Sequence, residues 1–345
     1  MSMNKDEAYK KIQNIFHANP SPVIVLGSGA SAPYHIASMG DLANSLKDLF
    51  AHKKYTNNAS VECVNKFLLN LDKGIGLEES LLDIRVTEEV EYDIIINVWN
   101  LIAEQDKKLL YDFTRGKRTL ELSKLFERLI YGRNDSIVNV VTTNYDRIAE
   151  YAASKTEAFI NTGFSHSYCG TMKQKLDAYP NKLKNSYTGR INIWKVHGSL
   201  DWFSKHDTTY YLPGVNEIPE EYVPCIITPG TNKYEKTSQE PHRSLLTHID
   251  EDFLNASGFV CIGYGFNDRH VHPKLLAAAK KRKLPILIIT MNITDPIQRN
   301  VMTGEYDYTA IYSDGKNGSV IKMNGDEITI LDEELWKLGN LCSII

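Results

Sequence analysis

The sequence predicts an α/β fold built on a parallel sheet, and three observations lead to that prediction. Short apolar runs of strand length recur at 23–26, 137–141, 191–196, 259–262 and 285–290. Helical periodicity fills most of the segments between them. The last run is almost wholly apolar, as expected for a strand that helices cover on both faces.

The first two of the predicted elements enclose a glycine-rich turn. Residues 5–18 have the spacing of an amphipathic helix, and Pro20 ends it. The apolar run at 23–26 then stops in the turn Gly27-Ser28-Gly29-Ala30-Ser31, and a helical pattern follows from about 41 to 50. Strand, tight glycine turn and helix form the opening of a nucleotide-binding α/β unit.

A mostly helical insertion is predicted from about 51 to 131, where leucine, isoleucine and valine recur at mixed spacing among charged residues. We expect residues 1–300 to form one nucleotide-binding domain that carries this insertion. Residues 204–222 predict a loop and a hairpin, and 225–228 predict a further strand. The segment 301–345 has short alternating stretches with turn signals, which predict a small C-terminal β/α extension.

Composition excludes several classes of protein. The chain has 345 residues, 42% of them hydrophobic, enough for one large α/β domain with insertions or two modest domains. Its net charge of −4 shows no basic excess of the kind that favours direct binding to nucleic acid or to a membrane. The longest apolar runs are far shorter than a membrane span.

The cysteines and histidines give no sign of a metal site. The five cysteines are scattered and form no C-x-x-C pair, which argues against structural zinc and against a disulfide framework. His270 and His272 have no third ligand at metal spacing. The charged segment before Pro20 is typical of an amphipathic helix rather than a signal peptide, so we expect a reducing, cytoplasmic setting.

Polar clusters stand directly after four of the predicted strands. They are Gly27-Ser28-Gly29, Thr143-Asn144-Tyr145-Asp146, His197-Gly198 and Gly263-Tyr264-Gly265. In an open parallel sheet, ligands bind in the crevice at the carboxyl ends of the strands. Helix capping by Asn or Asp would explain one such cluster but gives no reason for four. The sequence therefore predicts that the clusters converge on one pocket.

The residue types in these clusters suit a phosphate-bearing ligand. Glycines let the backbone approach a pyrophosphate, and the N–H groups that follow can bind anions, although Ala32 leaves the G-x-G-x-x-G fingerprint incomplete. Asn144 offers a neutral donor and acceptor, and Asp146 offers a carboxylate. His197 can act as a base near neutral pH. The alternative is that His197 is structural and that Asn144 or Asp146 only caps a helix.

The ordered set of motifs GSGAS, TTNYD, VHGS and GYGFND resembles the sirtuin-type NAD-binding domain over residues 23–272. It is most similar to the divergent bacterial sirtuin-like proteins that hydrolyse NAD in anti-phage defence. The resemblance implies a Rossmann-like sheet with NAD as substrate. Protein-deacylating sirtuins carry two C-x-x-C pairs for zinc and a Gly-Ile-Pro-Asp-Phe-Arg stretch. Here neither occurs, and 33–43 reads PYHIASMGDLA, which argues against deacylation.

The resemblance also implies a role for each matching residue. The residues that would line the NAD phosphates are Gly27, Ser28, Gly29, Ala30 and Ser31. Those that would contact the adenosine part are Gly263, Tyr264 and Gly265, and Thr143, Gly198 and Asp268 are also assigned to cofactor binding. Asn144 and Asp146 match the N-x-D pair near the nicotinamide and its ribose. His197 matches the catalytic histidine.

Together these assignments imply an NAD glycohydrolase, with Asn144, Asp146 and His197 as its catalytic residues. An NAD-binding or ADP-ribose-binding regulatory subunit without turnover, or an NAD-dependent deacylase, are the alternatives. Proteins of this kind assemble into oligomers, so we expect a homo-oligomer, with a separately encoded HerA-type ATPase or an Argonaute protein as partner. Free cleavage of NAD would poison the cell, so activity is expected to stay latent until triggered.

Overall fold

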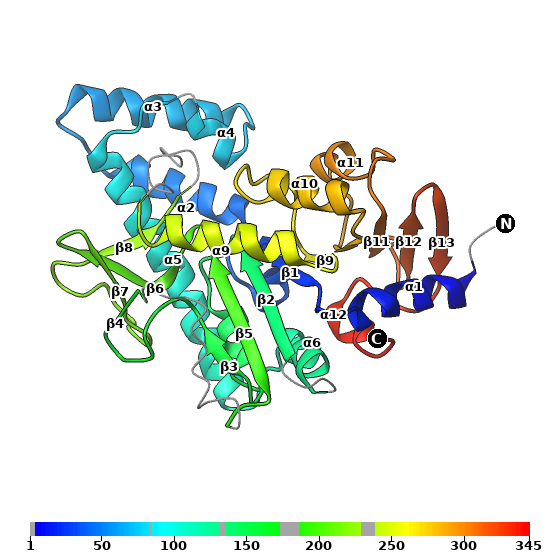
Figure 1. The fold of residues 1–345 in the computed structure, drawn as a ribbon. Coiled ribbons are helices and arrows are strands. Elements are labelled where there is room, and N and C mark those ends of the chain that lie inside the picture. The colour runs from blue at the N-terminus through cyan, green and yellow to red at the C-terminus, as the bar shows by residue number, and fades with distance from the viewer. Residues whose placement is uncertain (1–3, 83, 132–135, 173–185, 229–238) are drawn as a thin grey trace.

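The computed structural model describes residues 4–82, 84–131, 136–172, 186–228 and 239–345. Its main sheet contains seven parallel strands: β1 (Val23–Leu26), β2 (Ser136–Thr142), β3 (Phe159–Asn161), β5 (Gly189–Lys195), β9 (Phe259–Ile262), β10 (Ile286–Ile289) and β11 (Tyr308–Ser313). β12 (Ser319–Met323) and β13 (Asp326–Ile330) complete nine strands in the order β13-β12-β11-β10-β9-β1-β2-β5-β3 (Figure 1). The predicted parallel α/β fold is confirmed.

The strand order changes direction at β1. The strands β2, β5 and β3 lie on one side of β1, and β9, β10 and β11 lie on the other. Ile24 of β1 stands opposite Val140 of β2 and opposite Val260 of β9, in parallel register with both. A switch of this kind opens a crevice at the carboxyl ends of the strands, which is where open α/β sheets bind ligands.

Helices cover both faces of the sheet. Along β1, Ile24 and Leu26 enter one core, and Val23 and Val25 enter the other, because successive side chains of a strand alternate in direction. The first core also receives α1 (Lys5–His17), α2 (Met39–His52), α6 (Glu121–Ile130), α7 (Ile148–Ala153) and α12 (Leu338–Leu341). The second receives α9 (His242–Asn255), α10 (His272–Arg282) and α11 (Asp295–Asn300). Burial on both faces explains the unbroken apolar run of β10.

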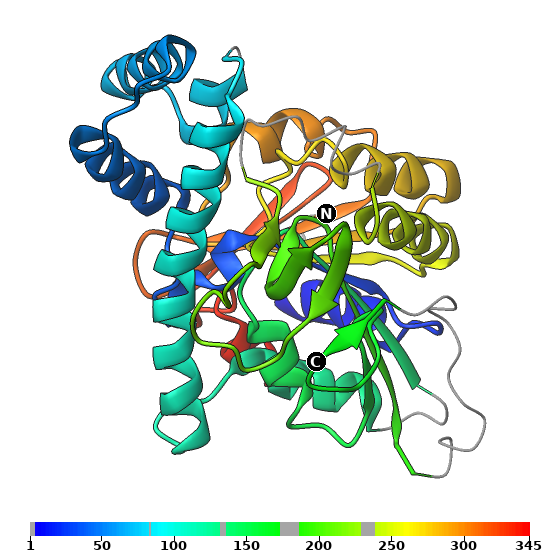
Figure 2. The same cartoon turned by 90° about the vertical axis from the view of Figure 1, so that its left-hand side faces the viewer.

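The predicted insertion is helical in the structure. After α2, the described residues form α3 (Asn58–Asp72), α4 (Leu77–Leu82), the 27-residue helix α5 (Glu88–Thr114) and α6. Figure 2 shows α5 running along one side of the molecule. Despite this length, no helix among the described residues combines the length and apolarity that crossing a membrane requires.

The segment after residue 300 extends the main sheet. β11 pairs in parallel with β10, and β12 and β13 follow as an antiparallel hairpin. The boundary predicted at 300 lies between α11 and β11, and the division into two domains stays a prediction.

A second, antiparallel sheet has the order β4-β7-β6-β8. Its strands are β4 (Gly170–Thr171), β6 (Gly198–Lys205), β7 (Thr208–Tyr211) and β8 (Val223–Ile226). The sequence predicts a hairpin over 204–222 and a strand over 225–228. In the structure the hairpin begins earlier, at Gly198, and joins β8 in one sheet. The pairing of β6 with β8 spans a long loop, which the local pattern does not reveal.

Candidate functional site

The four polar clusters lie at the carboxyl ends of four neighbouring strands. Gly27 follows β1, Thr143 follows β2, Gly263 follows β9, and His197 comes two residues after β5. These strands are adjacent in the order β9-β1-β2-β5. The clusters therefore lie along one edge of the sheet, called here the crevice edge, while their convergence on one ligand pocket stays a prediction.

The glycine loop after β1 packs against the loop after β9. Gly29 N donates to Gly263 O at 3.0 Å, and Gly27 N donates to Ile262 O at 3.1 Å. Gly263 has a φ of +55°, and a Cβ on it would lie 2.2 Å from Ala30 N. Only glycine fits there, because the two backbones touch. The close approach expected toward a pyrophosphate is thus, in this structure, an approach between two loops.

Most backbone N–H groups of the β1 loop donate within the protein. Ala30 N donates to Gly27 O at 3.0 Å, and Ser31 N donates to Ser28 O at 3.1 Å. Ser28 and Gly29 are exposed, whereas Gly27 and Ser31 are buried. The loop therefore presents Ser28 and Gly29 to solvent, and its role in phosphate binding stays a prediction.

Asn144 and Asp146 tie the loop after β2 to the loop after β1. Asn144 Nδ2 donates to Gly27 O at 2.9 Å and to Ser31 Oγ at 3.0 Å, and Ser31 Oγ donates to Asp146 Oδ2 at 2.7 Å. The other oxygen of Asp146 accepts from Ile148 N at 3.1 Å, in the first turn of α7. Asp146 therefore accepts a hydrogen bond at the start of α7 and also faces the glycine loop, and its contact with a ligand stays a prediction.

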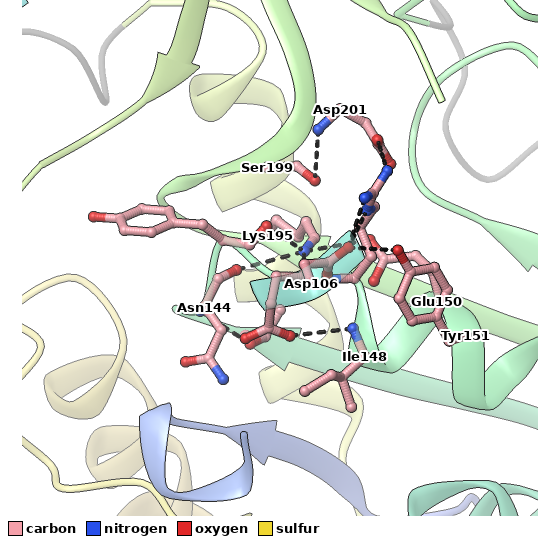
Figure 3. Close-up of polar contacts among 12 residues, drawn as sticks. Asp106, Asn144, Ile148, Glu150, Tyr151, Lys195, Ser199 and Asp201 are labelled. Carbon is pink, nitrogen blue, oxygen red and sulfur yellow. Dashed lines mark hydrogen bonds and ion pairs between the residues drawn. The ribbon is translucent and has the colours of Figure 1, made fainter. Parts of the chain in front are cut away.

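Lys195, the last residue of β5, holds the same loop in place and is 2% exposed. Its Nζ donates to the carbonyl oxygen of Asp146 and lies 3.4 Å and 3.5 Å from those of Tyr145 and Asn144 (Figure 3). The same ammonium pairs with Glu150 Oε1 at 3.3 Å. Burial raises the pKa of Glu150 to about 7 and also raises that of Asp146, while the charge of Lys195 opposes both shifts. No local motif of the sequence identifies this lysine as a site residue.

Arg147 is the centre of a buried ion cluster, which consists of Asp106, Arg147, Tyr151 and Asp201 (Figure 3). The Arg147 guanidinium donates to Asp106 Oδ2 from Nε at 2.8 Å and from a terminal nitrogen at 2.6 Å. The other terminal nitrogen donates to Asp201 Oδ1 at 2.9 Å. Arg147 N donates to Asp106 Oδ1 at 2.9 Å, and Tyr151 OH donates to Asp106 Oδ2 at 2.5 Å. Asp106 belongs to α5, so the insertion directly positions the loop that carries Asn144.

Local sequence patterns do not predict the ion cluster, although α5 carries one signal of it. Asp106 comes three residues after Ala103 and three before Leu109, so a carboxylate stands within the apolar stripe of the helix. It is 0% exposed in the structure. A charged residue in such a stripe indicates a buried partner, but the spacing does not say which one.

His197 pairs with Asp268. Its Nε2 lies 2.5 Å from Asp268 Oδ2, and the two side chains are 7% and 9% exposed. Asp268 Oδ1 accepts from His270 N at 2.9 Å and from Val271 N at 3.0 Å. His197 Nδ1 is buried and has no hydrogen-bond partner among the described residues. The resemblance implies a cofactor-binding role for Asp268, and in the structure its carboxylate contacts the predicted catalytic histidine.

Gly198 allows the chain to turn from His197 into β6. Its φ is +88°, and a Cβ on it would lie 2.1 Å from Cys225 O of β8. Thr143 is half-buried, and its N–H donates to Leu26 O at 3.3 Å. Both residues support the crevice edge through the backbone, and their contacts with a ligand stay predictions.

Tyr264 and Gly265 have different surroundings. Tyr264 is 3% exposed and packs with Phe266 in the apolar core, and burial raises the pKa of its hydroxyl well above the usual range. Gly265 is half-buried, and the nearest atom to a Cβ on it would be Asn267 Nδ2 at 3.6 Å. A side-chain methyl group on Gly265 would therefore make only an ordinary van der Waals contact.

A cavity of about 310 Å³ borders the ion cluster. Its lining includes Arg147, Glu150 and Asp201, together with Thr162 and Tyr211. None of the predicted ligand-binding residues is among the described residues that line it, so the cavity is separate from the crevice edge. The described residues contain no group of three His, Cys, Asp or Glu side chains that could hold a metal ion.

A family model for a SIR2-like domain matches residues 138–311, which are 174 of the 345 residues. No curated protein sequence matches the chain. Similar solved structures include a Sir2 homologue–NAD complex, with 13% identity, a TM-score of 0.45, and coverage of 87% of this chain and 87% of that chain. They also include a Sir2 homologue mutant–ADP-ribose complex, with 14% identity, a TM-score of 0.46, and coverage of 89% and 90%. Sir2Tm bound to a propionylated peptide shows 12% identity, a TM-score of 0.42, and coverage of 84% and 89%.

Proposed function

The chain belongs to the SIR2-like domain family, and on that basis we propose that it is an NAD glycohydrolase. It would cleave the nicotinamide–ribose bond of NAD to give nicotinamide and ADP-ribose. One observation carries the proposal. At the edge of the sheet where Asn144 lies, His197 has a buried ring nitrogen that accepts no hydrogen bond from the described residues.

Cleavage of the nicotinamide–ribose bond depends more on the precise placement of the ribose and a water than on a strong general acid. As the bond to nicotinamide lengthens, positive charge builds on the ribose, and the leaving group is already cationic. Neutral hydrogen bonds on the ribose hydroxyls and a placed water then lower the barrier. His197 would accept a proton from a ribose hydroxyl or from that water, and such base catalysis contributes roughly 10²–10⁴-fold.

Asn144 would orient the ribose or the water. Its Nδ2 already donates to Gly27 O and Ser31 Oγ, which fixes the amide plane. The amide oxygen is then left as the acceptor for a hydroxyl or water. Both oxygens of Asp146 are engaged within the protein, which favours positioning of the loop over direct contact with nicotinamide.

We further propose a biological setting, which rests on the sequence resemblance. The enzyme would be a cytoplasmic, homo-oligomeric effector of anti-phage defence that depletes NAD when triggered. A separately encoded HerA-type ATPase or an Argonaute protein would be its partner. Latency follows from the reaction itself, because continuous turnover would empty the host cell of NAD.

The test is chromatography of NAD incubated with the purified protein, with and without the product of an adjacent gene. Wild type should release nicotinamide and ADP-ribose, and His197→Ala and Asn144→Ala should lower the rate by roughly 10²-fold or more. His52→Ala, an exposed position at the end of α2, is the matched control and should turn over normally. Turnover at the wild-type rate by both site variants would contradict the proposal. Tight nucleotide binding with NAD intact in every condition would support the regulatory alternative instead.

A further inference from the structure

The pair of His197 and Asp268 joins two parts of the chain that are far apart in sequence. His197 lies in the turn between β5 and β6, and Asp268 lies just before α10. The 2.5 Å contact between Nε2 and Oδ2 is almost fully shielded, since the two side chains are 7% and 9% exposed. A charge-assisted hydrogen bond away from water is stronger than the same bond at the surface.

Asp268 is itself held in a fixed orientation. Its Oδ1 accepts from the backbone N–H groups of His270 and Val271 at 2.9 and 3.0 Å. These two bonds set the plane of the carboxylate and direct Oδ2 toward the imidazole. The N-terminal end of α10, an 11-residue helix, also favours a negative charge at this place.

We propose that Asp268 is a positioning residue that sets the tautomer of His197, with the proton on Nε2 and with Nδ1 as the base. An ionised carboxylate only accepts hydrogen bonds, so Nε2 donates to it. A neutral imidazole has one N–H, and Nδ1 is therefore left as the acceptor. This nitrogen is the buried one that no described residue contacts. The identity of the group that gives a proton to Nδ1 during the reaction rests on the proposed function. The tautomer of His197 in the free protein does not.

A purely structural role for Asp268 makes a different prediction. If it only fixes the turn before α10, an asparagine should replace it without effect, because the asparagine oxygen can accept from His270 N and Val271 N in the same way. Toward His197, however, asparagine can present an NH₂ group, which requires Nε2 to accept and moves the proton to Nδ1. The Asp268→Asn variant therefore separates the two roles.

The experiment is ¹⁵N NMR of histidine-labelled protein at alkaline pH without NAD, combined with steady-state kinetics. The His197 signals are identified by their loss in His197→Ala. Wild type should show the proton on Nε2, and Asp268→Asn should shift His197 toward the Nδ1–H tautomer. Its kcat should fall about 10²-fold or more, with the KM for NAD nearly unchanged. Asp250→Asn, which alters an exposed carboxylate paired with Lys274, is the control and should change neither.

Two outcomes would overturn the inference. One is an Nδ1–H tautomer of His197 in wild type, and the other is an unchanged tautomer in Asp268→Asn. If wild type does not cleave NAD, the tautomer measurement still decides the role of Asp268, so failure of the proposed function is recognised separately. If Asp268→Asn does not fold, Asp268→Ser replaces it, because a serine hydroxyl can accept from the N–H groups of the same turn but is too short to reach His197.

Discussion

The ion cluster and the crevice edge meet at the loop after β2, and they are built in opposite ways. In the ion cluster, the carboxylate of Asp106 accepts four hydrogen bonds, three from Arg147 and one from Tyr151. At the crevice edge, the buried Nδ1 of His197 accepts none from the described residues. A saturated network makes a unit rigid, whereas a buried polar atom without a partner is costly unless a ligand or water completes it.

This contrast indicates that the ion cluster positions the loop after β2, whereas the crevice edge carries the groups proposed to act on NAD. The ion cluster and Lys195 hold the backbone of residues 144–147. The acceptor atoms left for a ligand belong instead to side chains at the crevice edge, those of Asn144 and His197. Changes in the ion cluster should therefore alter stability first, and changes at the crevice edge should alter NAD turnover first.

The largest expected effect on stability is that of Arg147→Met. It leaves Asp106 and Asp201 buried without their cation, and breaking a buried ion pair in this way costs about 3–5 kcal/mol. Urea unfolding measures the loss. Lys205→Met removes the exposed pair with Glu221 and should leave the unfolding midpoint unchanged. Equal midpoints for the two variants would mean that the ion cluster does not hold the fold together.

A smaller effect should appear in the pH dependence of stability. Burial raises the pKa of Glu150 from 4.5 to about 7. Between these values the folded protein keeps a proton that the unfolded chain has released. The contribution of Glu150 to stability is thus fully present below pH 4.5 and is lost as the pH rises through 7, by up to about 3 kcal/mol.

Glu150→Gln removes this titration, so its stability relative to wild type should increase between pH 5 and pH 8. Unfolding curves at several pH values give the difference. Glu305→Gln alters an exposed carboxylate paired with Lys280 and should keep a constant difference from wild type. A constant difference for Glu150→Gln as well would show that this carboxyl is not protonated in the folded protein near neutral pH.

The smallest effects compare two glycines at the crevice edge. Gly263→Ala places a Cβ against the backbone of Ala30 and should lower the free energy of unfolding by about 2–3 kcal/mol. Gly265→Ala meets no atom closer than 3.6 Å and should change stability by less than about 0.5 kcal/mol. Thermal unfolding distinguishes them. A raised KM for NAD in Gly265→Ala, with stability intact, would identify that position as a ligand contact.

The crevice edge could be predicted from the sequence because its signals are local. An apolar run directly precedes each of Gly27, Thr143, His197 and Gly263. Because the carboxyl ends of parallel strands lie at the same edge of a sheet, these positions come together. The role of Asp268 could not be predicted, because its pairing with His197 spans 71 positions. The motif placed Asp268 near the site, and only the fold shows which atom it contacts.

The ion cluster and the contacts of Lys195 with the loop after β2 could not be predicted from the sequence for the same reason. Asp106 and Arg147 are 41 positions apart, and Lys195 is 49 positions from the carbonyl of Asp146. The predicted strand over 191–196 includes Lys195 without indicating that its side chain is buried. Burial of a charge depends on which segments pack together, and no local pattern carries that information.

The four hydrogen bonds of Asp106 also bear on how the molecule unfolds. Asp106 belongs to the insertion, and its partners belong to the segment that leads from β2 into α7. Trp99, on the same helix, donates to Leu200 O of β6 at 3.1 Å. If the insertion opened alone, Arg147 would lose one of its two buried carboxylate partners and keep only Asp201. The insertion is a separate block in sequence, but these contacts couple it to the sheet, so we expect any ligand that stabilises the crevice edge to protect α5 from exchange with solvent as well.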